Sequence, residues 1–141
     1  MSDDPLHCTC AVLRGASRHL SRRYDAALAG LGLSLNQYSI LARLDRLDAA
    51  DVGKLAELLV MDRSTLGHLI RPLQARTWLE TRRDPDDRRR TVLALTSTGR
   101  AVLDAARPIV AEHQRGLETA LGEEDAATLI ALLERVTALN R

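Results

Sequence analysis

A change of hydrophobic period in the middle of the chain constrains the fold more than any other feature. Residues 51–59 and 63–76 carry apolar side chains at helical spacing, and only three residues separate the two segments. After Trp78 the period falls from about 3.6 to about 2 residues. Residues 79–83 and 91–95 then flank a tip rich in aspartate. The pattern predicts two short helices joined by a tight turn and followed directly by a β-hairpin.

Two helices are expected before this segment. Asp4 followed by Pro5 is typical of an N-cap with proline in the first helical turn. Apolar residues then recur at alternating steps of four and three as far as Gly32, so a long helix is expected over residues 4–31. Ser34 with a glutamine three residues later is a capping-box signature for a second helix.

Two more helices are expected after the hairpin. Thr96 or Ser97 starts the fifth, which Pro108 should kink and Gly122 should close. Three acidic residues directly after that glycine favour the N-terminal end of a sixth helix. The expected fold is mainly α: a winged helix-turn-helix with six helices and a small β-hairpin wing. Residues 1–141 should form a single domain, with the winged helix-turn-helix over residues 33–97.

The arginines are concentrated in one part of the chain. The net charge is only +1, yet residues 63–90 hold eight arginines and His68 against four acids, while residues 101–141 hold four arginines against seven acids. This asymmetry suits one surface that meets phosphates and another that meets protein. The apolar runs are too short to cross a bilayer, and no secretory signal is evident, so we expect a cytoplasmic protein with free thiols.

The polar side of residues 63–76 and the hairpin carry side chains that can donate hydrogen bonds to a DNA duplex. Such a helix fits the major groove, and a hairpin tip can cross the backbone or enter the minor groove. Arginine suits both tasks because its planar fork matches phosphate oxygens and the guanine edge. A solvated hairpin with local ion pairs is the alternative. The candidate DNA-binding residues are Arg63, Ser64, Thr65, His68, Arg71, Arg82, Asp87, Arg88, Arg89 and Arg90.

Two stretches of this region resemble the MarR family of transcriptional regulators. They are Leu55-Ala56-Glu57 through Asp62-Arg63-Ser64-Thr65-Leu66, and Asp84-Pro85-Asp86-Asp87-Arg88-Arg89 through Leu95-Thr96. The resemblance runs from about residue 10 to the C-terminus. It implies a repressor that binds a palindromic double-stranded DNA operator, with Arg89 in the minor groove and Asp87 holding it in position. The chain has Thr77-Trp78 where many members have Gly-Leu, which affects the direction in which the wing leaves the helix.

The flanking helices suggest a homodimer. Residues 4–31 and 98–141 are amphipathic, so a monomer would leave their apolar stripes partly exposed. The resemblance implies that these helices join two subunits, which then read half-sites about one helical turn apart. A compact monomer with the same helices folded back on the core is the alternative.

Cys10 is the candidate for sensing an oxidant. It lies on the apolar stripe of the first helix, whereas Cys8 points about 200° away. His7 and Arg14 can approach its sulfur, a setting that favours the thiolate and its oxidation. A partial resemblance to the organic-hydroperoxide-sensing branch pairs Cys10 with Tyr24. About 21 Å of helix separates them, so they can meet only across a dimer. The alternatives are a small buried apolar role for Cys10, or a metal site with its neighbours.

A small aromatic or anionic inducer is the second candidate signal, bound between the dimer helices and the winged part. The residues that could line its pocket are Arg14, Arg18, Tyr24, Tyr38 and Arg43. The sequence shows no Ser-His-Asp order, phosphate-binding glycine loop or paired carboxylates in a plausible frame, so no enzyme, cofactor or metal is expected. A non-specific architectural DNA-binding protein remains the alternative function.

Overall fold

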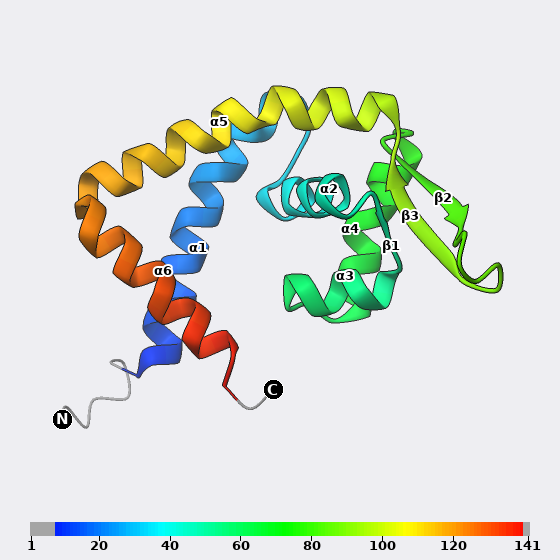
Figure 1. Ribbon diagram of the computed structural model, residues 1–141. Coiled ribbons are helices and arrows are strands. Elements are labelled where there is room, and N and C mark those ends of the chain that lie inside the picture. The colour runs from blue at the N-terminus through cyan, green and yellow to red at the C-terminus, as the bar shows by residue number, and fades with distance from the viewer. Residues whose placement is uncertain (1–7, 140–141) are drawn as a thin grey trace. The chain divides into compact units, whose positions relative to one another are not determined.

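The computed structural model describes residues 8–139, which fall into two compact units that meet at residues 106 and 107. The predicted cap Asp4, the adjoining Pro5, and His7 lie outside the described residues. The first unit contains most of the secondary structure and the start of the fifth long helix (Figure 1). Its helices are α1 (Thr9–Leu28), the 3₁₀ helix η2 (Ala29–Leu31), α2 (Leu35–Leu47), α3 (Val52–Leu59) and α4 (Arg63–Ala75).

Side-chain caps begin the three central helices. The Ser34 hydroxyl accepts from the Gln37 N–H at 3.2 Å, and the Gln37 side-chain oxygen accepts from the Ser34 N–H at 3.2 Å, which confirms the predicted capping box. Asp51 caps α3 and Asp62 caps α4, each by accepting from the N–H three residues on. These bonds satisfy donors that a helix N-terminus would otherwise leave unpaired, so the helices begin where the sequence predicts.

A three-stranded antiparallel sheet adjoins these helices. Its strands are β1 (Ala49–Ala50), β2 (Leu79–Arg83) and β3 (Thr91–Leu95), in the order β1-β3-β2. The predicted hairpin is β2 with β3, in a register that pairs Leu79 with Leu95. Strand β1 was not predicted, because two residues are too few to show alternation. It pairs with β3 through Ala49 and Ala50 and so joins the helix-turn-helix to the hairpin.

Aliphatic side chains from the α-helices of the first unit and from β3 form most of the core. Aromatic residues make up only 2% of the chain, so leucine and isoleucine fill the interior. Burying each such side chain stabilises the fold by about 1.5–3 kcal/mol. The fully buried large side chains are Leu28, Ile40, Leu41, Leu44, Leu55, Leu66, Leu73 and Leu103.

Helix α5 (Ser97–Leu121) is attached to the turn between α4 and β2. The Thr96 hydroxyl donates to the Thr77 carbonyl at 2.6 Å and accepts from the Gly99 N–H at 3.0 Å. A Cβ atom at Gly99 would lie 2.0 Å from the Trp78 carbonyl oxygen, so only glycine permits this approach. Thr77 itself has a φ of +60°, in the left-handed region, at the place where a Gly-Leu pair is common in the family that the sequence resembles.

The first helix is shorter than predicted at both ends. It begins at Thr9 rather than at residue 4, because Cys8 has an extended backbone and its sulfur accepts from the Ala11 N–H at 3.3 Å. It ends at Leu28, and the 3₁₀ turn after it closes at Gly32 with a φ of +69°. The first buried residue of α1 is Tyr24, so the apolar stripe before it is not packed in the single chain.

The second unit, residues 107–139, consists of the rest of α5 and α6 (Glu123–Thr137). Helix α5 continues through Pro108, and Gly122 separates the two helices with a φ of +88°. Acidic side chains occupy the first turn of α6, as predicted. Several of its large apolar side chains are exposed: Leu129, Ile130, Leu132 and Val136. Within residues 8–139, no helix combines the length and the apolar character needed to span a membrane.

We predict that Val60→Gly stabilises the protein. Val60 ends α3 with a φ of +53°, and its side chain is 66% exposed, so it gives up little packing. A β-branched residue in the left-handed region costs about 1–2 kcal/mol, whereas glycine costs about 0.5–1 kcal/mol through the unfolded chain. Thermal unfolding should therefore show a net gain of about 0.5–1 kcal/mol, a rise of a few degrees in Tm.

Val12→Gly is the matched control for this substitution. Val12 is also exposed but has an ordinary helical backbone within α1, so the same change should lower Tm. A lower Tm for both variants would contradict the assignment of strain to Val60.

Candidate nucleic-acid interface

Helix α4 has one buried face and one exposed face. Leu66, Ile70 and Leu73 are buried, as the helical spacing predicts. The helix continues through Gly67 and Pro72, although glycine and proline both weaken a helix interior. All five predicted DNA-binding residues of this helix are exposed on the other side: Arg63, Ser64, Thr65, His68 and Arg71.

The cap of α4 occupies one of these candidates. One oxygen of Asp62 accepts from the Thr65 N–H at 2.7 Å, and the other accepts from the Thr65 hydroxyl at 2.7 Å. The hydroxyl proton is therefore engaged within the protein, and Thr65 can act toward a ligand only as an acceptor. These hydrogen bonds, that from the Thr65 backbone first, hold the pKa of Asp62 below its ordinary value of 3.8. The carboxylate thus stays ionised at the positive end of the helix.

Aspartates shape the tip of the wing, which we define as residues 79–95. An oxygen of Asp87 accepts from the Arg89 N–H at 3.0 Å, and an oxygen of Asp84 accepts from the Asp86 N–H at 2.9 Å. The Asp84 N–H donates to the Arg90 carbonyl at 3.0 Å and closes the loop. Asp87 therefore holds the backbone of Arg89 in place, which leaves its guanidinium group available.

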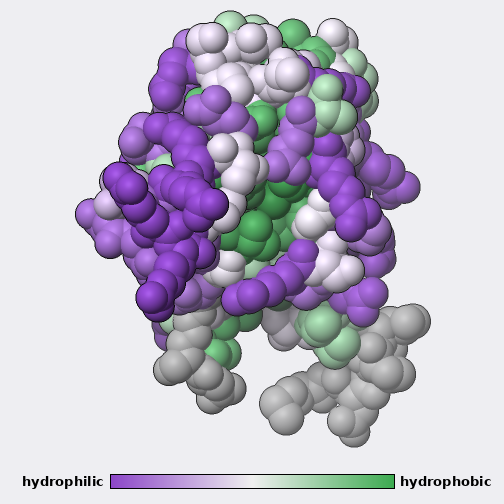
Figure 2. Space-filling view, turned by 90° about the vertical axis from the view of Figure 1, so that its right-hand side faces the viewer, coloured by the Kyte–Doolittle hydropathy of each residue, from purple (hydrophilic) through white to green (hydrophobic). Residues whose placement is uncertain are grey.

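The wing arginines divide into two groups. The guanidinium of Arg82 lies 3.3 Å from Glu80, that of Arg83 donates to the Arg88 carbonyl at 2.8 Å, and that of Arg90 pairs with Asp51. Within residues 8–139, the guanidinium groups of Arg88 and Arg89 show no such partner. The two arginines at the tip are thus the ones positioned to bind an external anion. On the side where the wing projects, hydrophilic residues lie on both flanks of a strip of hydrophobic surface (Figure 2).

A groove of about 640 Å³ separates the first turn of α3, helix α4 and the sheet. Arg63, Arg71 and Arg90 contribute to its lining. A Cβ atom at Gly53 would lie 2.8 Å from Nη2 of Arg63, so the glycine leaves room for that guanidinium. The Gln74 amide donates to the Thr81 hydroxyl at 3.2 Å and links α4 to β2. Sequence reasoning missed these links, because they join residues from different elements.

The five residues predicted to line an inducer pocket do not share one cavity in the single chain. Arg14 and Arg18 flank a shallow groove of about 360 Å³ on α1. Tyr38 and Arg43 flank another of about 410 Å³ on α2. Tyr24 is buried in the core. The single chain therefore offers two separate surface grooves at these positions.

Both cysteines are exposed and free. The interpretation of Cys10 as a small buried residue is therefore wrong for the single chain: it lies in the first turn of α1, before any residue of that helix is buried. Among the residues that the structure describes, no group of three or more His, Cys, Asp or Glu side chains could hold a metal ion.

A helix-turn-helix followed by an arginine-tipped hairpin defines a winged helix-turn-helix protein. The model of the MarR family matches residues 33–91, from the start of α2 to the start of β3. Over this segment the chain is therefore similar to the MarR family of transcriptional regulators.

Individual transcriptional regulators are similar to a larger part of the chain. The organic hydroperoxide resistance transcriptional regulator of Bacillus subtilis is 26% identical over 97 residues, which cover 69% of this chain and 66% of that protein, just under two-thirds of its length. The structure of the transcriptional repressor CouR bound to a 23-mer DNA duplex has a TM-score of 0.83 and 26% identity, and covers 96% of this chain and 99% of that one. BpsR of Bordetella bronchiseptica shares the fold with a TM-score of 0.89, 21% identity, and coverage of 99% and 100%.

We predict that Asp62→Asn reduces the sensitivity of the protein to acid. The pKa of Asp62 is lowered in the folded state, so its ionised form contributes stability above the unfolded pKa of about 3.9, and this contribution is lost as pH falls through the folded value. Asparagine still caps the helix but does not titrate. Across a pH series from about 6 to 3, Tm of the variant should start lower than that of the wild type and fall less below about pH 4. Parallel curves would contradict this role.

Proposed function

We propose that this chain is a homodimeric repressor that acts in the cytoplasm by binding a palindromic DNA operator. Helix α4 would lie in the major groove and the wing tip in the minor groove. The observation that carries the proposal is the pair of guanidinium groups, Arg88 and Arg89, for which the structure of residues 8–139 shows no partner, in the same compact unit as the exposed polar face of α4. CouR, at 26% identity, is a repressor solved on a DNA duplex, and this supports the same partner here.

The proposal assigns different tasks to the candidate residues. Arg63, Ser64, His68 and Arg71 would contact phosphates and base edges from α4. Arg88 and Arg89 would do so from the wing, whereas Asp87, through its bond to the Arg89 N–H, would shape the tip. The ion pair of Arg82 with Glu80 makes a structural task the simpler one for that side chain.

The remaining segments would form the dimer. We assign residues 33–97 to DNA binding, and residues 4–31 and 98–141 to dimerisation. The exposed apolar side chains of α6 and the uncovered first half of α1 support this division, because a second subunit could remove both from water. Two copies would then read half-sites about one helical turn apart, and MarR regulators are typically homodimers.

A non-specific architectural DNA-binding protein would share the basic wing but discriminate little between sequences. Locating the operator upstream of the protein's own gene or a neighbouring one, and competing it with random duplex at fixed salt, separates the two functions. A repressor should keep at least about a thousandfold preference for its operator. Equal competition by random duplex would leave the architectural function standing.

We predict that Arg89→Ala weakens operator binding and lowers its salt dependence. Each lost phosphate contact should reduce the slope of log K against log salt by about 0.9, and a homodimer loses two contacts at once. Arg22→Ala, an exposed arginine of α1, is the matched control and should leave the slope unchanged. The measurement is a binding titration at several salt concentrations. An unaltered slope for Arg89→Ala would count against the wing contact.

For the signal that releases DNA, we propose oxidation of Cys10. The thiolate would attack the terminal oxygen of an organic hydroperoxide: the O–O bond breaks, an S–O bond forms, and the leaving alkoxide takes up a proton to become an alcohol. Cys10 is a free thiol, and the name of the Bacillus subtilis relative supports this proposal. A small aromatic acid is the second candidate, since 6-hydroxynicotinic acid regulates DNA binding by BpsR.

We predict that Cys10→Ser abolishes release of the operator by cumene hydroperoxide without changing affinity in reducing buffer. Cys8→Ser is the matched control: Cys8 is also exposed, but its sulfur caps α1. Release measured by fluorescence anisotropy should persist in this control. Unchanged release in Cys10→Ser would end the thiol proposal for that residue and direct the search to aromatic acids.

A further inference from the structure

We propose that Arg90, although it belongs to the arginine-rich wing, is a positioning residue that fastens the wing to the first turn of α3 through Asp51. The inference rests on the proposed function, because it concerns how the DNA-binding surface is held together. It separates the three consecutive arginines of the tip, Arg88 to Arg90, into two that bind DNA and one that does not.

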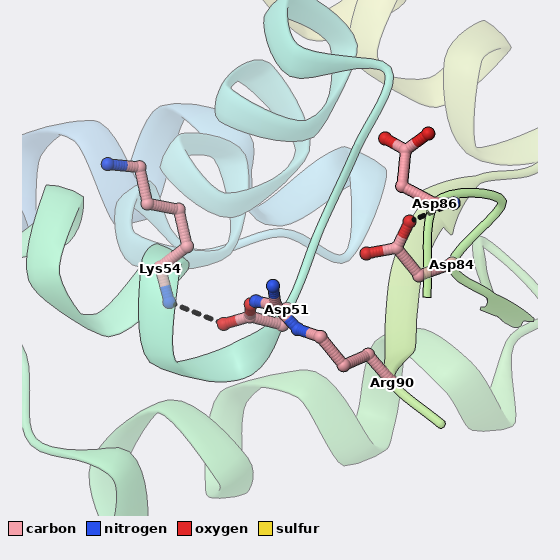
Figure 3. A network of polar contacts seen from close by, with 5 residues as sticks. All are labelled: Asp51, Lys54, Asp84, Asp86 and Arg90. Carbon is pink, nitrogen blue, oxygen red and sulfur yellow. Dashed lines mark hydrogen bonds and ion pairs between the residues drawn. The ribbon is translucent and has the colours of Figure 1, made fainter. Parts of the chain in front are cut away.

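The chain fold brings the two residues together. Asp51 follows the last residue of β1, and Arg90 precedes the first residue of β3, 39 residues further along. Strands β1 and β3 pair through only two residues on each side, which gives the wing a weak backbone connection to the helix-turn-helix. The ion pair between Nη2 of Arg90 and Oδ2 of Asp51 continues this connection beyond the end of the ladder (Figure 3).

Asp51 binds both helix α3 and the wing. One of its oxygens accepts from the Lys54 N–H at 2.7 Å and caps α3, and the other accepts from Arg90. The bond from the Lys54 backbone, followed by the side-chain bond from Arg90, lowers the pKa of Asp51 below 3.8. The carboxylate is therefore ionised at neutral pH, and its side chain is only 24% exposed. Such charge-assisted bonds are stronger than neutral ones.

The same contact makes Arg90 unsuitable as a phosphate ligand. A phosphate that bound its guanidinium would have to displace Asp51 or approach that carboxylate closely, at an electrostatic cost. In the part of the chain that the structure describes, no carboxylate pairs with the guanidinium group of Arg88 or Arg89. Because α4 and the wing tip must reach two grooves of one duplex together, an error in the position of the wing reduces binding even when every DNA-contacting side chain is intact.

Asp51→Asn tests the inference, because the two roles of Arg90 predict opposite results. Asparagine keeps an oxygen that caps α3 but loses the charge that holds Arg90. If Arg90 contacts DNA, removing a nearby negative charge should tighten operator binding or leave it unchanged. If Arg90 fastens the wing, binding should weaken, by roughly three- to fivefold for a partly exposed ion pair. Asp86→Asn, the same substitution at the wing tip, is the matched control and should not weaken binding.

Arg90→Gln completes a double-mutant cycle. If Arg90 acts through Asp51, the substitution Arg90→Gln should weaken operator binding in the wild-type background. It should have little further effect in the Asp51→Asn background. The salt slope should fall by less than for Arg89→Gln, which removes a direct contact. An equal loss from Arg90→Gln in both backgrounds would show a direct DNA contact and overturn the inference.

Hydrogen exchange of the DNA-free protein gives a result that does not depend on DNA binding. The amides of Asp84 and Arg90 are hydrogen-bonded within the wing tip, and they should exchange faster in Asp51→Asn but not in Asp86→Asn. Unchanged exchange in Asp51→Asn would overturn the inference. If the wild type binds no operator, the proposed function fails, whereas the exchange experiment still decides whether Asp51 fastens the wing.

Discussion

Strand β3 determines where the two parts of the proposed DNA surface lie. It pairs with β1, which leads into the helix-turn-helix, and with β2, which leaves α4 and forms the wing. Its residues Val92–Leu95 are all buried, so the strand is fixed by packing as well as by its hydrogen bonds. The wing can therefore project into solvent while its base remains part of the core.

The wing also depends on electrostatic interactions among its arginines and their acceptors. An arginine-rich tip repels itself unless nearby acceptors hold the guanidinium groups or a polyanion binds them. In this wing Glu80, the Arg88 carbonyl and Asp51 each accept from one arginine, and aspartate turns shape the loop. Part of the repulsion is thus offset within the protein, and the charge that remains is concentrated at Arg88 and Arg89. The wing can therefore be rich in arginine even though only two of its arginines, Arg88 and Arg89, are proposed to contact DNA.

The sequence predicted features that depend on neighbouring residues and missed those that depend on distant ones. The capping box of Ser34 and the start of α4 after Asp62 follow from short spacings, and both were found. Strand β1 and the bond from Arg90 to Asp51 were missed, because each depends on pairing between segments far apart in the chain. The hairpin was predicted from alternation, yet β3 is buried on both faces and shows none. The turn-forming tip between the two segments was therefore the more reliable part of that prediction.

The proposed sensing and the proposed dimerisation both involve α1. Cys10 lies in the first turn of this helix, and Tyr24 lies about 21 Å further along it, buried in the core of the same chain. An oxidised sulfur at Cys10 therefore cannot reach its own Tyr24 while the helix is intact. In the proposed function, an oxidised Cys10 would act on Tyr24 of another chain or through loss of the first turns of α1. Because no residue of α1 before Tyr24 is buried in the single chain, those turns can rearrange without disturbing its core, and the exposed start of α1 is where a signal can act at least cost to folding.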